Sequence, residues 1–327
     1  MNRHCLVTGG AGFIGSHLTE ALLSRGDRVT VVDDLSTGRE TNLETVQGHG
    51  RLNIITGDLG ALAADVAIDV DEVYHLAAAV GVQLICQQTY ESIERNVQPT
   101  RELLNVLREQ RNSRRPAKLF LASSSEVYGN NPEPTWNEER QLVFGPSSQP
   151  RWSYGVSKLL DEFMALAAWQ EYQVPVVVGR FFNVVGPRQT GTYGMVLPRL
   201  VAAATSGGPL VVHDDGQQTR CFAHVSDVVD AVIGLMGNDA ATGQVFNIGS
   251  DRPVTILELA EQVIKTVGSE LDIEFQSYQQ AFGDNFQDVR HRVPDIRRLR
   301  TAIDYQPKFT LEAIIRELVS LATNQRN

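Results

Sequence analysis

The sequence has 327 residues and a mass of 36.0 kDa, and 42% of its residues are hydrophobic and 21% charged, as in a folded globular protein with one large domain or two smaller ones. The 29 basic and 39 acidic residues give a net charge of −10, which disfavours nucleic acid as a partner because the surface repels phosphates. No stretch approaches the ~20 apolar residues of a membrane helix. The first residues lead directly into an apolar segment without a basic leader or a cleavage site, so we expect a cytoplasmic protein without a membrane partner.

The cysteines and histidines indicate neither a disulfide framework nor a metal site. Cys5, Cys86 and Cys221 are odd in number and widely spaced, which favours free thiols in a reducing compartment. The seven histidines show no His-x-x-x-His spacing and no pairing with cysteine. We therefore expect no metal.

The first 180 residues alternate between strand and helix signals. Apolar runs predict strands at His4–Thr8, Arg28–Val32, Leu52–Thr56, Glu72–Leu76, Lys118–Ala122 and Val174–Val178. Helical spacing of apolar residues predicts helices at His17–Arg25, Ser92–Arg111 and Trp152–Tyr172. Apolar strands that alternate with helices predict an α/β fold, a Rossmann-type doubly wound parallel sheet covered on both faces.

After Arg180 the pattern changes. Segments 183–194 and 207–216 are rich in Gly, Pro and polar residues, and the next signals predict helices that begin near Leu197, His224 and Ile256, with a short strand at Val245–Ile248. We therefore predict an NAD-binding Rossmann domain over 1–180 and a smaller substrate-binding region over 181–327. About 223–250 of that region is expected to pack back on the Rossmann sheet.

A glycine-rich turn joins the first strand to the first helix. In TGGAGFIG, Gly9 suits the tight turn, Gly12 lets a pyrophosphate approach the backbone, and Gly15 allows close packing of helix and strand. Such a turn can also be purely structural, but Asp33 ends the next strand, where an acid hydrogen-bonds a ribose diol. A carboxylate there repels the 2′-phosphate of NADP, so NAD is the expected cofactor. Asp58 either caps the adenine or is an exposed loop residue.

Tyr154 and Lys158 stand four residues apart, which places both side chains on one face of a helix. A free tyrosine has a pKa near ~10, and lowering this pKa to ~7 requires about 4 kcal/mol of phenolate stabilisation. A lysine ammonium and an oxidised nicotinamide are plausible sources. Tyr-x-x-x-Lys alone is usually structural, but here it follows a phosphate turn and the serines 123–125 at the end of the fifth strand. A serine there either hydrogen-bonds a substrate oxygen or caps the next turn.

Nine motifs in this order make the chain resemble an extended short-chain dehydrogenase/reductase that modifies nucleotide sugars, similar to UDP-glucose 4-epimerases and UDP-glucuronate decarboxylases. They are TGGAGFIGSH, VVDDLSTG, YHLAA, SSSEVYG, WSYGVSK, RFFNVVGPRQ, QTRCFAHVSDVVDA, FNIGS and HRVPDI, and the likeness runs from Cys5 to about Leu318. The resemblance implies that Tyr154, assisted by Ser124, deprotonates the 4-hydroxyl of the sugar. C4 then gives a hydride to NAD beside Lys158, and a 4-keto sugar results.

The resemblance also implies roles for further residues. The implied catalytic residues are Ser124, Glu126, Tyr154 and Lys158. The implied cofactor-binding residues are Gly9, Gly12, Phe13, Ile14, Gly15, Asp33, Asp34, Ser36, Gly38, Asp58, Leu59, Leu76, Ala77, Ala78, Asn96, Tyr154 and Lys158. The implied substrate-binding residues are Ser124, Ser125, Asn183, Arg220 and Arg292. The two arginines would neutralise the diphosphate, although each could instead form a surface ion pair. Relatives of this type commonly form homodimers, here through the helices Ser92–Arg111 and Trp152–Tyr172.

Two sets of motifs disagree about the reaction that follows oxidation at C4. DDLSTG and GPRQTGTYGMVLPR look epimerase-like, whereas Ser125-Glu126 and PRWSYGVSK resemble the decarboxylating branch. Glu126 could act as a base or orient a water, and it could also repel a uronate. We expect a 4-epimerase of a UDP-hexose or UDP-hexuronate, with a UDP-glucuronate decarboxylase or a related 4-keto-forming sugar-nucleotide enzyme as the alternative. A non-catalytic NAD(P)-binding sensor or structural subunit is the alternative of another class.

Overall fold

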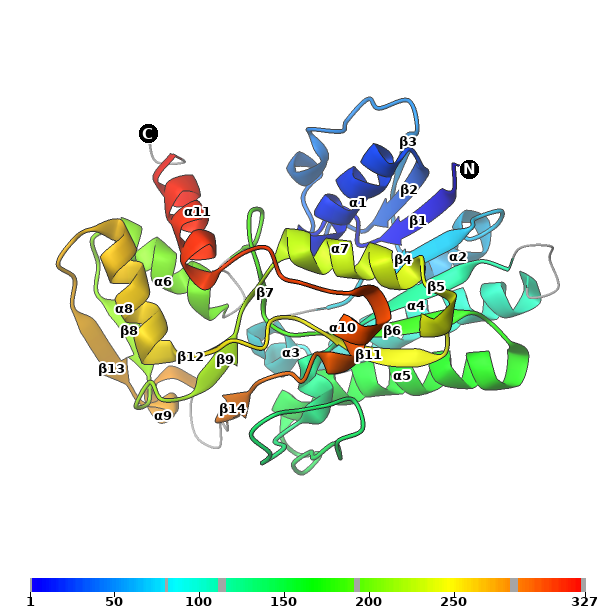
Figure 1. Ribbon diagram of the computed structural model, residues 1–327. Coiled ribbons are helices and arrows are strands. Elements are labelled where there is room, and N and C mark those ends of the chain that lie inside the picture. The colour runs from blue at the N-terminus through cyan, green and yellow to red at the C-terminus, as the bar shows by residue number, and fades with distance from the viewer. Residues whose placement is uncertain (1, 80–81, 111–115, 191–194, 283–287, 325–327) are drawn as a thin grey trace.

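The centre of the molecule is a sheet of seven parallel strands in the order β11-β6-β5-β4-β1-β2-β3 (Figure 1). The computed structural model describes residues 2–79, 82–110, 116–190, 195–282 and 288–324. The strands of the sheet are β1 (His4–Thr8), β2 (Arg28–Asp33), β3 (Leu52–Thr56), β4 (Glu72–His75), β5 (Lys118–Ser124), β6 (Val176–Phe181) and β11 (Gln244–Ile248). The chain builds outward from β1 in both directions, so a crevice opens at the carboxyl ends of β1 and β4. The predicted Rossmann-type sheet is confirmed.

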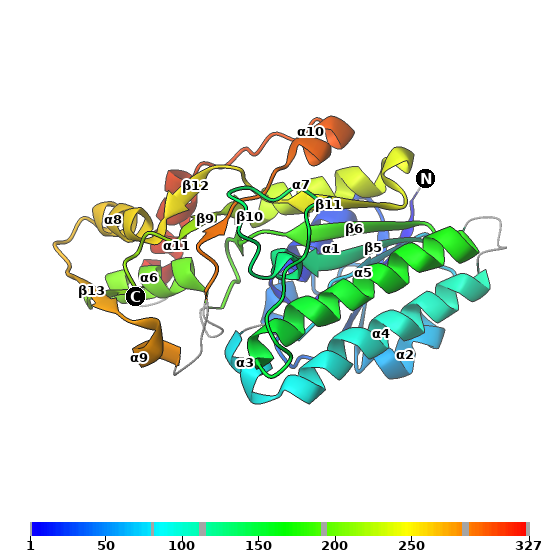
Figure 2. The ribbon, with the colours of Figure 1, turned by 90° about the horizontal axis from the view of Figure 1, so that it is seen from below.

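Helices cover both faces of this sheet (Figure 2). Helices α1 (Phe13–Arg25) and α7 (Val225–Met236) contact each other on one face, and α2 (Leu59–Val66), α4 (Thr89–Glu109) and α5 (Ser153–Tyr172) lie side by side on the other. One buried apolar cluster fills each interface between sheet and helices. This double cover explains why the strands are apolar on both sides. None of the described helices combines the length and the apolar character that a membrane crossing requires.

Several boundaries differ from those predicted. α1 begins at Phe13, four residues earlier than predicted, because Gly12 is its N-cap. β5 continues to Ser124, and β6 begins at Val176, two residues later than predicted. α4 begins at Thr89, and the predicted end of this helix at Arg111 lies outside the described residues. The sequence pattern did not predict α2, a short helix capped by the Asp58 carboxylate, which accepts a hydrogen bond from the Gly60 N–H at 2.8 Å.

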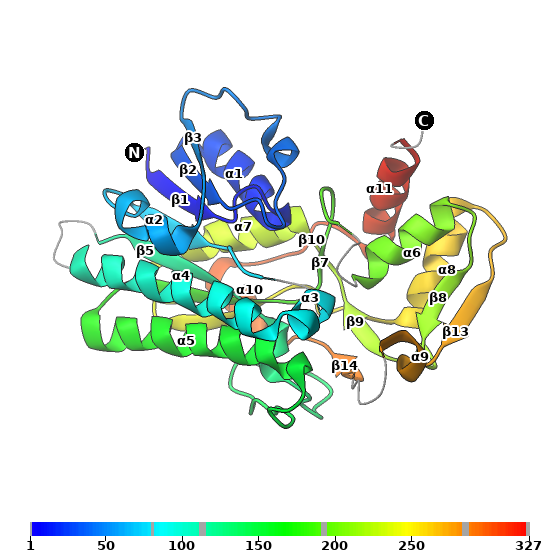
Figure 3. The same cartoon turned by 180° about the vertical axis from the view of Figure 1, so that it is seen from behind.

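A smaller lobe lies beside the carboxyl ends of the main sheet (Figure 3). Three helices pack around its apolar core, α6 (Val196–Thr205), α8 (Ile256–Val267) and α11 (Leu311–Asn324). Two small sheets complete it, β8 (Leu210–His213) with β13 (Ile273–Gln276), and β9 (Thr219–Cys221) between β12 (Pro253–Thr255) and β14 (His291–Arg292). The remaining elements are α3 (Val82–Gln87), β7 (Val184–Val185), β10 (Ala223–His224), α9 (Tyr278–Phe282) and α10 (Arg297–Ile303).

The chain returns from the smaller lobe to the main sheet. β11 pairs in parallel with β6, α7 covers β5 and β6, and α10 contacts both α7 and β11. Residues after 180 therefore supply one of the seven strands. The separate binding roles of 1–180 and 181–327 remain a prediction.

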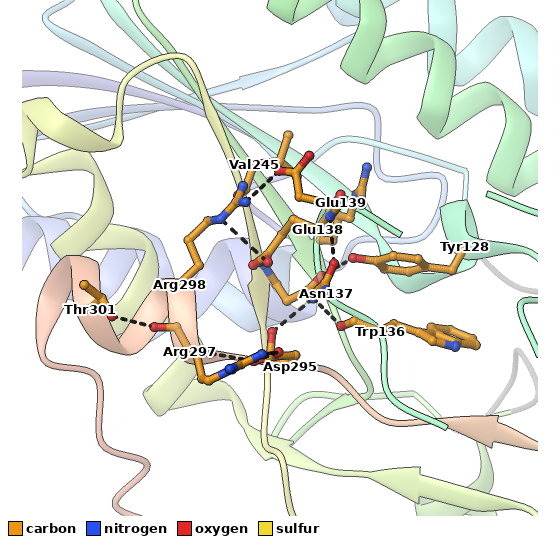
Figure 4. Close-up of polar contacts among 12 residues, drawn as sticks. Tyr128, Trp136, Asn137, Glu138, Glu139, Val245, Asp295, Arg297, Arg298 and Thr301 are labelled. Carbon is orange, nitrogen blue, oxygen red and sulfur yellow. Dashed lines mark hydrogen bonds and ion pairs between the residues drawn. The ribbon is translucent and has the colours of Figure 1, made fainter. Parts of the chain in front are cut away.

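Side chains bond to the outer edge of β11. The Glu138 carboxylate accepts a hydrogen bond from the Asn247 N–H at 2.8 Å, and Arg298 donates one to the Val245 carbonyl at 3.1 Å (Figure 4). Glu138 and Arg298 also lie within 3.7 Å of each other. These contacts occupy backbone groups that an open edge strand leaves unpaired.

Candidate active site

A cavity of about 1170 Å³ lies at the carboxyl ends of the main sheet and extends to the smaller lobe. A single small-molecule site has a volume of roughly 300–1,000 Å³, so this cavity has room for more than one ligand. Most of the residues that the sequence implicates line it: Gly9, Gly12, Phe13, Ile14, Gly15, Asp33, Asp34, Ser36, Asp58, Leu59, Leu76, Ala77, Ala78, Ser124, Ser125, Glu126, Tyr154, Asn183, Arg220 and Arg292. Gly38, Asn96 and Lys158 are not among its lining residues.

The glycine turn forms one end of the cavity. Gly9 has a φ of +68°, and a Cβ there would lie 2.8 Å from the Ala77 nitrogen. A Cβ on Gly15 would lie 2.1 Å from the Gly9 carbonyl oxygen, so a side chain at this position cannot be placed without moving the backbone. Gly12 caps α1, whose first N–H groups have no partner within the helix. This cradle suits a diphosphate.

Asp33 ends β2 beside this turn. Its carboxylate accepts hydrogen bonds from the N–H groups of Ala11 and Leu35, each at 2.9 Å. Burial raises the pKa of Asp33, and these backbone hydrogen bonds oppose that shift. A Cβ on Gly38 would lie 2.8 Å from an Asp33 carboxylate oxygen, so Gly38 packs against Asp33 without lining the cavity.

Asn96 supports the wall of the cavity from α4. Its side-chain oxygen accepts a hydrogen bond from the Ala79 N–H at 2.8 Å, and its amide donates to the Ser157 hydroxyl at 3.0 Å. It therefore joins the segment after β4 to α5.

Tyr154 and Ser124 meet where α5 begins and β5 ends, and both line the cavity. Burial strongly raises the pKa of the Tyr154 phenol and the charge of Glu126 adds to this, whereas a hydrogen bond with Ser124 lowers it. Lys158 lies one turn further along α5, where its ammonium bonds to Asp161 at 2.8 Å. Asp161 belongs to no motif that the sequence indicates, although a carboxylate three residues after a lysine on a helix is a recognisable pair.

Glu126 lies between two arginines at the cavity wall. Its carboxylate oxygens pair with Arg151 at 2.6 Å and with Arg292 at 2.7 Å. Burial alone would raise the pKa of Glu126, but the two guanidinium charges outweigh burial and hold this pKa well below its usual range. All three side chains line the cavity and together carry one positive charge in excess. Arg151 was not among the residues predicted for the site, and its place in PRWSY, three residues before Tyr154, is the signal in the sequence that points to it.

The wall from the smaller lobe carries a second polar group of residues. Asp288 accepts hydrogen bonds from Arg220 at 2.8 Å and from the Tyr278 hydroxyl at 2.7 Å. Asn183 lines the cavity and donates to the Cys221 carbonyl at 2.9 Å. No sequence spacing points to Asp288 or Tyr278 because both are far from Arg220 along the chain.

The model of the family described as GDP-mannose 4,6-dehydratase matches residues 6–318, nearly the whole chain. The chain belongs to the extended short-chain dehydrogenase/reductases that modify nucleotide sugars. A UDP-N-acetyl-α-D-glucosaminuronate decarboxylase of Bacillus cytotoxicus is 35% identical over 320 residues, which cover 98% of this chain and 97% of the relative. The resemblance inferred from the nine motifs is thereby confirmed.

Solved structures of related enzymes have the same fold. A UDP-N-acetylglucosamine 4-epimerase of Methanobrevibacter ruminantium, in complex with UDP-N-acetylmuramic acid, superposes with a TM-score of 0.88 at 30% identity and 99% coverage of both chains. A UDP-glucuronic acid 4-epimerase of Bacillus cereus, in complex with UDP-glucuronic acid and NAD, gives a TM-score of 0.87 at 26% identity and covers 98% of this chain and 99% of that one. The protein is therefore an enzyme of the epimerase and decarboxylase branch of the family.

Proposed function

We propose that the protein is an NAD-dependent decarboxylase of nucleotide-linked uronic acids that acts through a 4-keto sugar. The observation that carries this proposal is the placement of Glu126 between Arg151 and Arg292 at the cavity wall. The 35% identity to a UDP-sugar uronate decarboxylase supports it. The proposal reverses the order expected from the sequence, in which 4-epimerisation came first.

A uronate brings a carboxylate into the site, and a buried carboxylate needs a cation. Taken alone, Glu126 would repel it, as the sequence suggested, but the two arginines over-compensate the charge of Glu126. The Nε atoms of both arginines are buried and have no hydrogen-bond partner within the described residues. Arginine is well suited to hold a carboxylate because its donors form a planar fork. The sugar of a neutral hexose makes no use of this excess charge, whereas the diphosphate of any nucleotide sugar can, so the comparison of substrates below decides which group it meets.

The remaining residues suit proton transfer at C4. NAD, when bound, would accept a hydride from C4 of the sugar and return it later. Tyr154 would take the proton of the 4-hydroxyl, and Ser124 would hydrogen-bond the same oxygen. A ketone at C4 is β to the carboxylate at C6, so the C5–C6 bond breaks with loss of CO2. The electron pair passes to the C4 oxygen, where Tyr154 and Ser124 stabilise it, and C5 then takes up a proton.

We further propose NAD as the resident cofactor, held by the glycine turn and by Asp33. The close approach of backbone at Gly9 and Gly15 and the carboxylate at the end of β2 support this choice over NADP. Denaturing the purified protein and analysing the released nucleotide by mass tests it. Released NAD supports internal recycling, whereas an NADP-only preference in binding would contradict it.

The reaction itself is tested with UDP-glucuronate, UDP-N-acetylglucosaminuronate and UDP-glucose as separate substrates. We expect CO2 release from a uronate, with the sugar proton NMR spectrum gaining the signal of a second proton on C5, and no change in UDP-glucose. A C4-inverted uronate without CO2 would establish the second candidate, a 4-epimerase. No turnover of any nucleotide sugar would exclude both activities.

Two variants test the proposed residues. Tyr154→Phe should lower turnover at least ~100-fold while NAD binding persists, because an acid/base group is lost. Arg292→Gln should lower kcat/KM for the uronate by roughly 10–100-fold, as expected for a charged contact worth about 1.5–3 kcal/mol. The matched control is Arg290→Gln, because Arg290 is exposed, pairs with Asp215 at 2.8 Å and does not line the cavity. Equal losses in the Arg290 and Arg292 variants would contradict the proposed role of Arg292.

The 4-epimerase remains the second candidate because a similar structure, the UDP-glucuronic acid 4-epimerase, also takes a uronate. The DDLSTG motif favours the same activity. A non-catalytic sensor is less well supported, since Tyr154, Ser124 and Glu126 all reach the cavity.

A further inference from the structure

Asp161 places a carboxylate in the interior of the protein, directly against Lys158. Its Oδ2 accepts a hydrogen bond from the Lys158 ammonium at 2.8 Å, and the side chains of Lys158 and Asp161 are 2% and 0% exposed. Both residues lie on α5, whose first turn carries Tyr154. Lys158 is not among the residues that line the cavity, whereas Tyr154 is.

The pair is poorly explained as a device for stability. Within the described residues the Oδ1 atom of Asp161 is buried and makes no hydrogen bond of ordinary geometry, because the nearby Thr100 hydroxyl bonds to the Asn96 carbonyl at 3.0 Å and to His75 at 3.0 Å. Burying an ion pair costs desolvation energy that good geometry repays only when the remaining lone pairs are satisfied. Two apolar residues in place of Lys158 and Asp161 would often be as stable or more stable on a helix face packed on α4 and the sheet.

Among the charged and titratable groups near the pair, Asp161 is the one whose negative charge balances the Lys158 ammonium. Thr100 of α4 faces the Asp161 carboxylate, and so does Glu162 of α5. Glu162 is occupied by Arg180, with a shortest contact of 2.7 Å. His75 of β4 faces Lys158, and burial together with the lysine charge lowers the pKa of His75 to about 3, so it is neutral.

We propose that Asp161 is a positioning residue. It holds the Lys158 ammonium through their ion pair and partly offsets the effect of the lysine charge on Tyr154. The proposal rests on the proposed function, in which Tyr154 and Lys158 form the proton-transfer pair. The charges of Glu126 and Asp161 both raise the pKa of the Tyr154 phenol, and the hydrogen bond with Ser124 lowers it.

A consequence follows for the proton on Tyr154. A lysine charge that is not countered stabilises the phenolate, whereas the Asp161 carboxylate disfavours it. Burial is the largest cause that raises the pKa of Tyr154, and the charge of Asp161 contributes in the same direction. Removing the charge of Asp161 should therefore allow Tyr154 to act as a base at lower pH.

The test is the variant Asp161→Asn, which keeps the shape of the side chain and removes its charge. The measured quantity is the rate at which enzyme-bound NADH forms, at 340 nm, after mixing with a nucleotide uronate over a range of pH. We expect the acidic limb of this profile to move to lower pH by about one unit, as for loss of a unit charge about two helical turns away in a partly desolvated site. Asp161→Glu, which restores the charge, should return the limb toward its wild-type position.

Glu162→Gln is the matched control because it removes a neighbouring buried carboxylate that pairs with Arg180 and not with Lys158. It should reduce stability without moving the limb. The proposal would be overturned if the acidic limb of the pH profile had the same position in Asp161→Asn as in the wild type, or if Glu162→Gln shifted it equally.

A second measurement does not depend on turnover. The ultraviolet absorbance of tyrosinate, titrated in Asp161→Asn with and without Tyr154→Phe, isolates the ionisation of Tyr154. We expect this ionisation at lower pH than in the same pair of proteins with Asp161 intact, and an unchanged midpoint would count against the role. If Tyr154→Phe retains normal turnover, the proposed function fails. If only the pH shift is absent, the proposed function stands and the role of Asp161 fails.

Discussion

His75 links the stability of the protein to pH through a single buried side chain. Its ring nitrogens bond to the Thr8 hydroxyl at 2.7 Å and to the Thr100 hydroxyl at 3.0 Å, so it joins β1, β4 and α4. Burial, and then the charge of Lys158, lower the pKa of His75 from 6.5 to about 3. The folded protein thus disfavours the protonated ring, and the unfolded chain does not.

The stability that His75 contributes is therefore complete above pH 6.5 and is lost as the pH falls from 6.5 toward 3. Between pH 7.5 and pH 5.0 we expect this residue to account for a loss of about 2 kcal/mol. Denaturant unfolding at both pH values should show a smaller loss in His75→Gln, which retains polar groups for both threonines. His49→Gln, at an exposed histidine, should keep the wild-type dependence, and an equal loss in all three proteins would exclude His75 as the cause.

Gly15 lies so close to the backbone of the glycine turn that no side chain fits at this position. In Gly15→Ala the new Cβ would lie 2.1 Å from the Gly9 carbonyl oxygen, so the turn must open. We expect NAD affinity to fall at least ~10-fold by calorimetry, because the backbone N–H groups no longer converge on the diphosphate. Gly50→Ala, which meets open space, should bind NAD normally. Normal binding in Gly15→Ala would show that the turn does not hold the cofactor.

Some residues of the cavity could be predicted from the sequence. Their neighbours in the site either are close in sequence or lie at the same edge of the sheet. The glycine turn, Asp33 and Ser124 follow strands, and parallel strands bring their carboxyl ends together. Asp161 and Arg151 were missed because their importance lies in ion pairs, not in their own motifs. Glu126 and Arg292 are 166 residues apart, and only the folded chain shows that Arg292 cancels the repulsion expected from Glu126.

At the scale of elements, a buried carboxylate occupies a backbone N–H at the outer edge of β11, the edge that pairs with no other described strand. Glu138 bonds to the Asn247 N–H of this strand, and its side chain is only 4% exposed (Figure 4). Glu138→Ala would leave that N–H without its partner, and we expect a loss of about 1–3 kcal/mol in the free energy of unfolding, with more aggregation in light scattering. The neighbouring Glu139 is 77% exposed and pairs with Arg298 at 2.6 Å. Glu139→Ala should cost less than ~1 kcal/mol. Similar losses in both variants would contradict a specific role for Glu138 at this edge.

Elements with strong periodicity were predicted well, and those that depend on distant partners were not. All seven strands of the main sheet were predicted to within about two residues at their beginnings, because each contains a cluster of apolar and β-branched or aromatic residues. The pairs β8 with β13 and β9 with β14 escaped prediction, since β9 and β14 are short and β13 has exposed positions. α2 is only eight residues long and alanine-rich, so its periodicity is weak.

At the scale of the whole molecule, the net charge of −10 does not describe two local sites of the cavity, which favour anions. Arg151 and Arg292 outnumber Glu126 at the cavity wall, and a helix N-terminus with free N–H groups lies at its other end. Anionic ligands can therefore be bound locally by a protein whose overall charge repels them. Composition disfavours nucleic acid as a partner, but it carries no information on such local exceptions.

Large apolar side chains are exposed to solvent along one face of α4 and α5, and no contact within the described residues covers them. On α5, Val156, Leu160 and Phe163 are 46%, 45% and 64% exposed, and their spacing places them on one face of the helix. On the adjacent α4, Tyr90 and Ile93 are 74% and 38% exposed. These five residues lie on the two helices for which the sequence suggested dimer contacts. We propose that they meet a second copy of the chain, because exposed apolar patches of this kind mark interaction sites.

A double variant, Leu160→Asp with Phe163→Asp, tests the dimer. We expect light scattering coupled to size exclusion to give the 36.0 kDa of one chain for the variant and twice that mass for the wild type. The monomer should also lose activity, since α5 carries Tyr154 and Lys158 and loses the packing that fixes its position. Phe275→Asp is the matched control, because Phe275 is a comparably exposed aromatic residue, at 57%, on β13 of the smaller lobe. A wild-type mass of one chain, or dissociation by the Phe275 variant as well, would show that α4 and α5 do not form the interface.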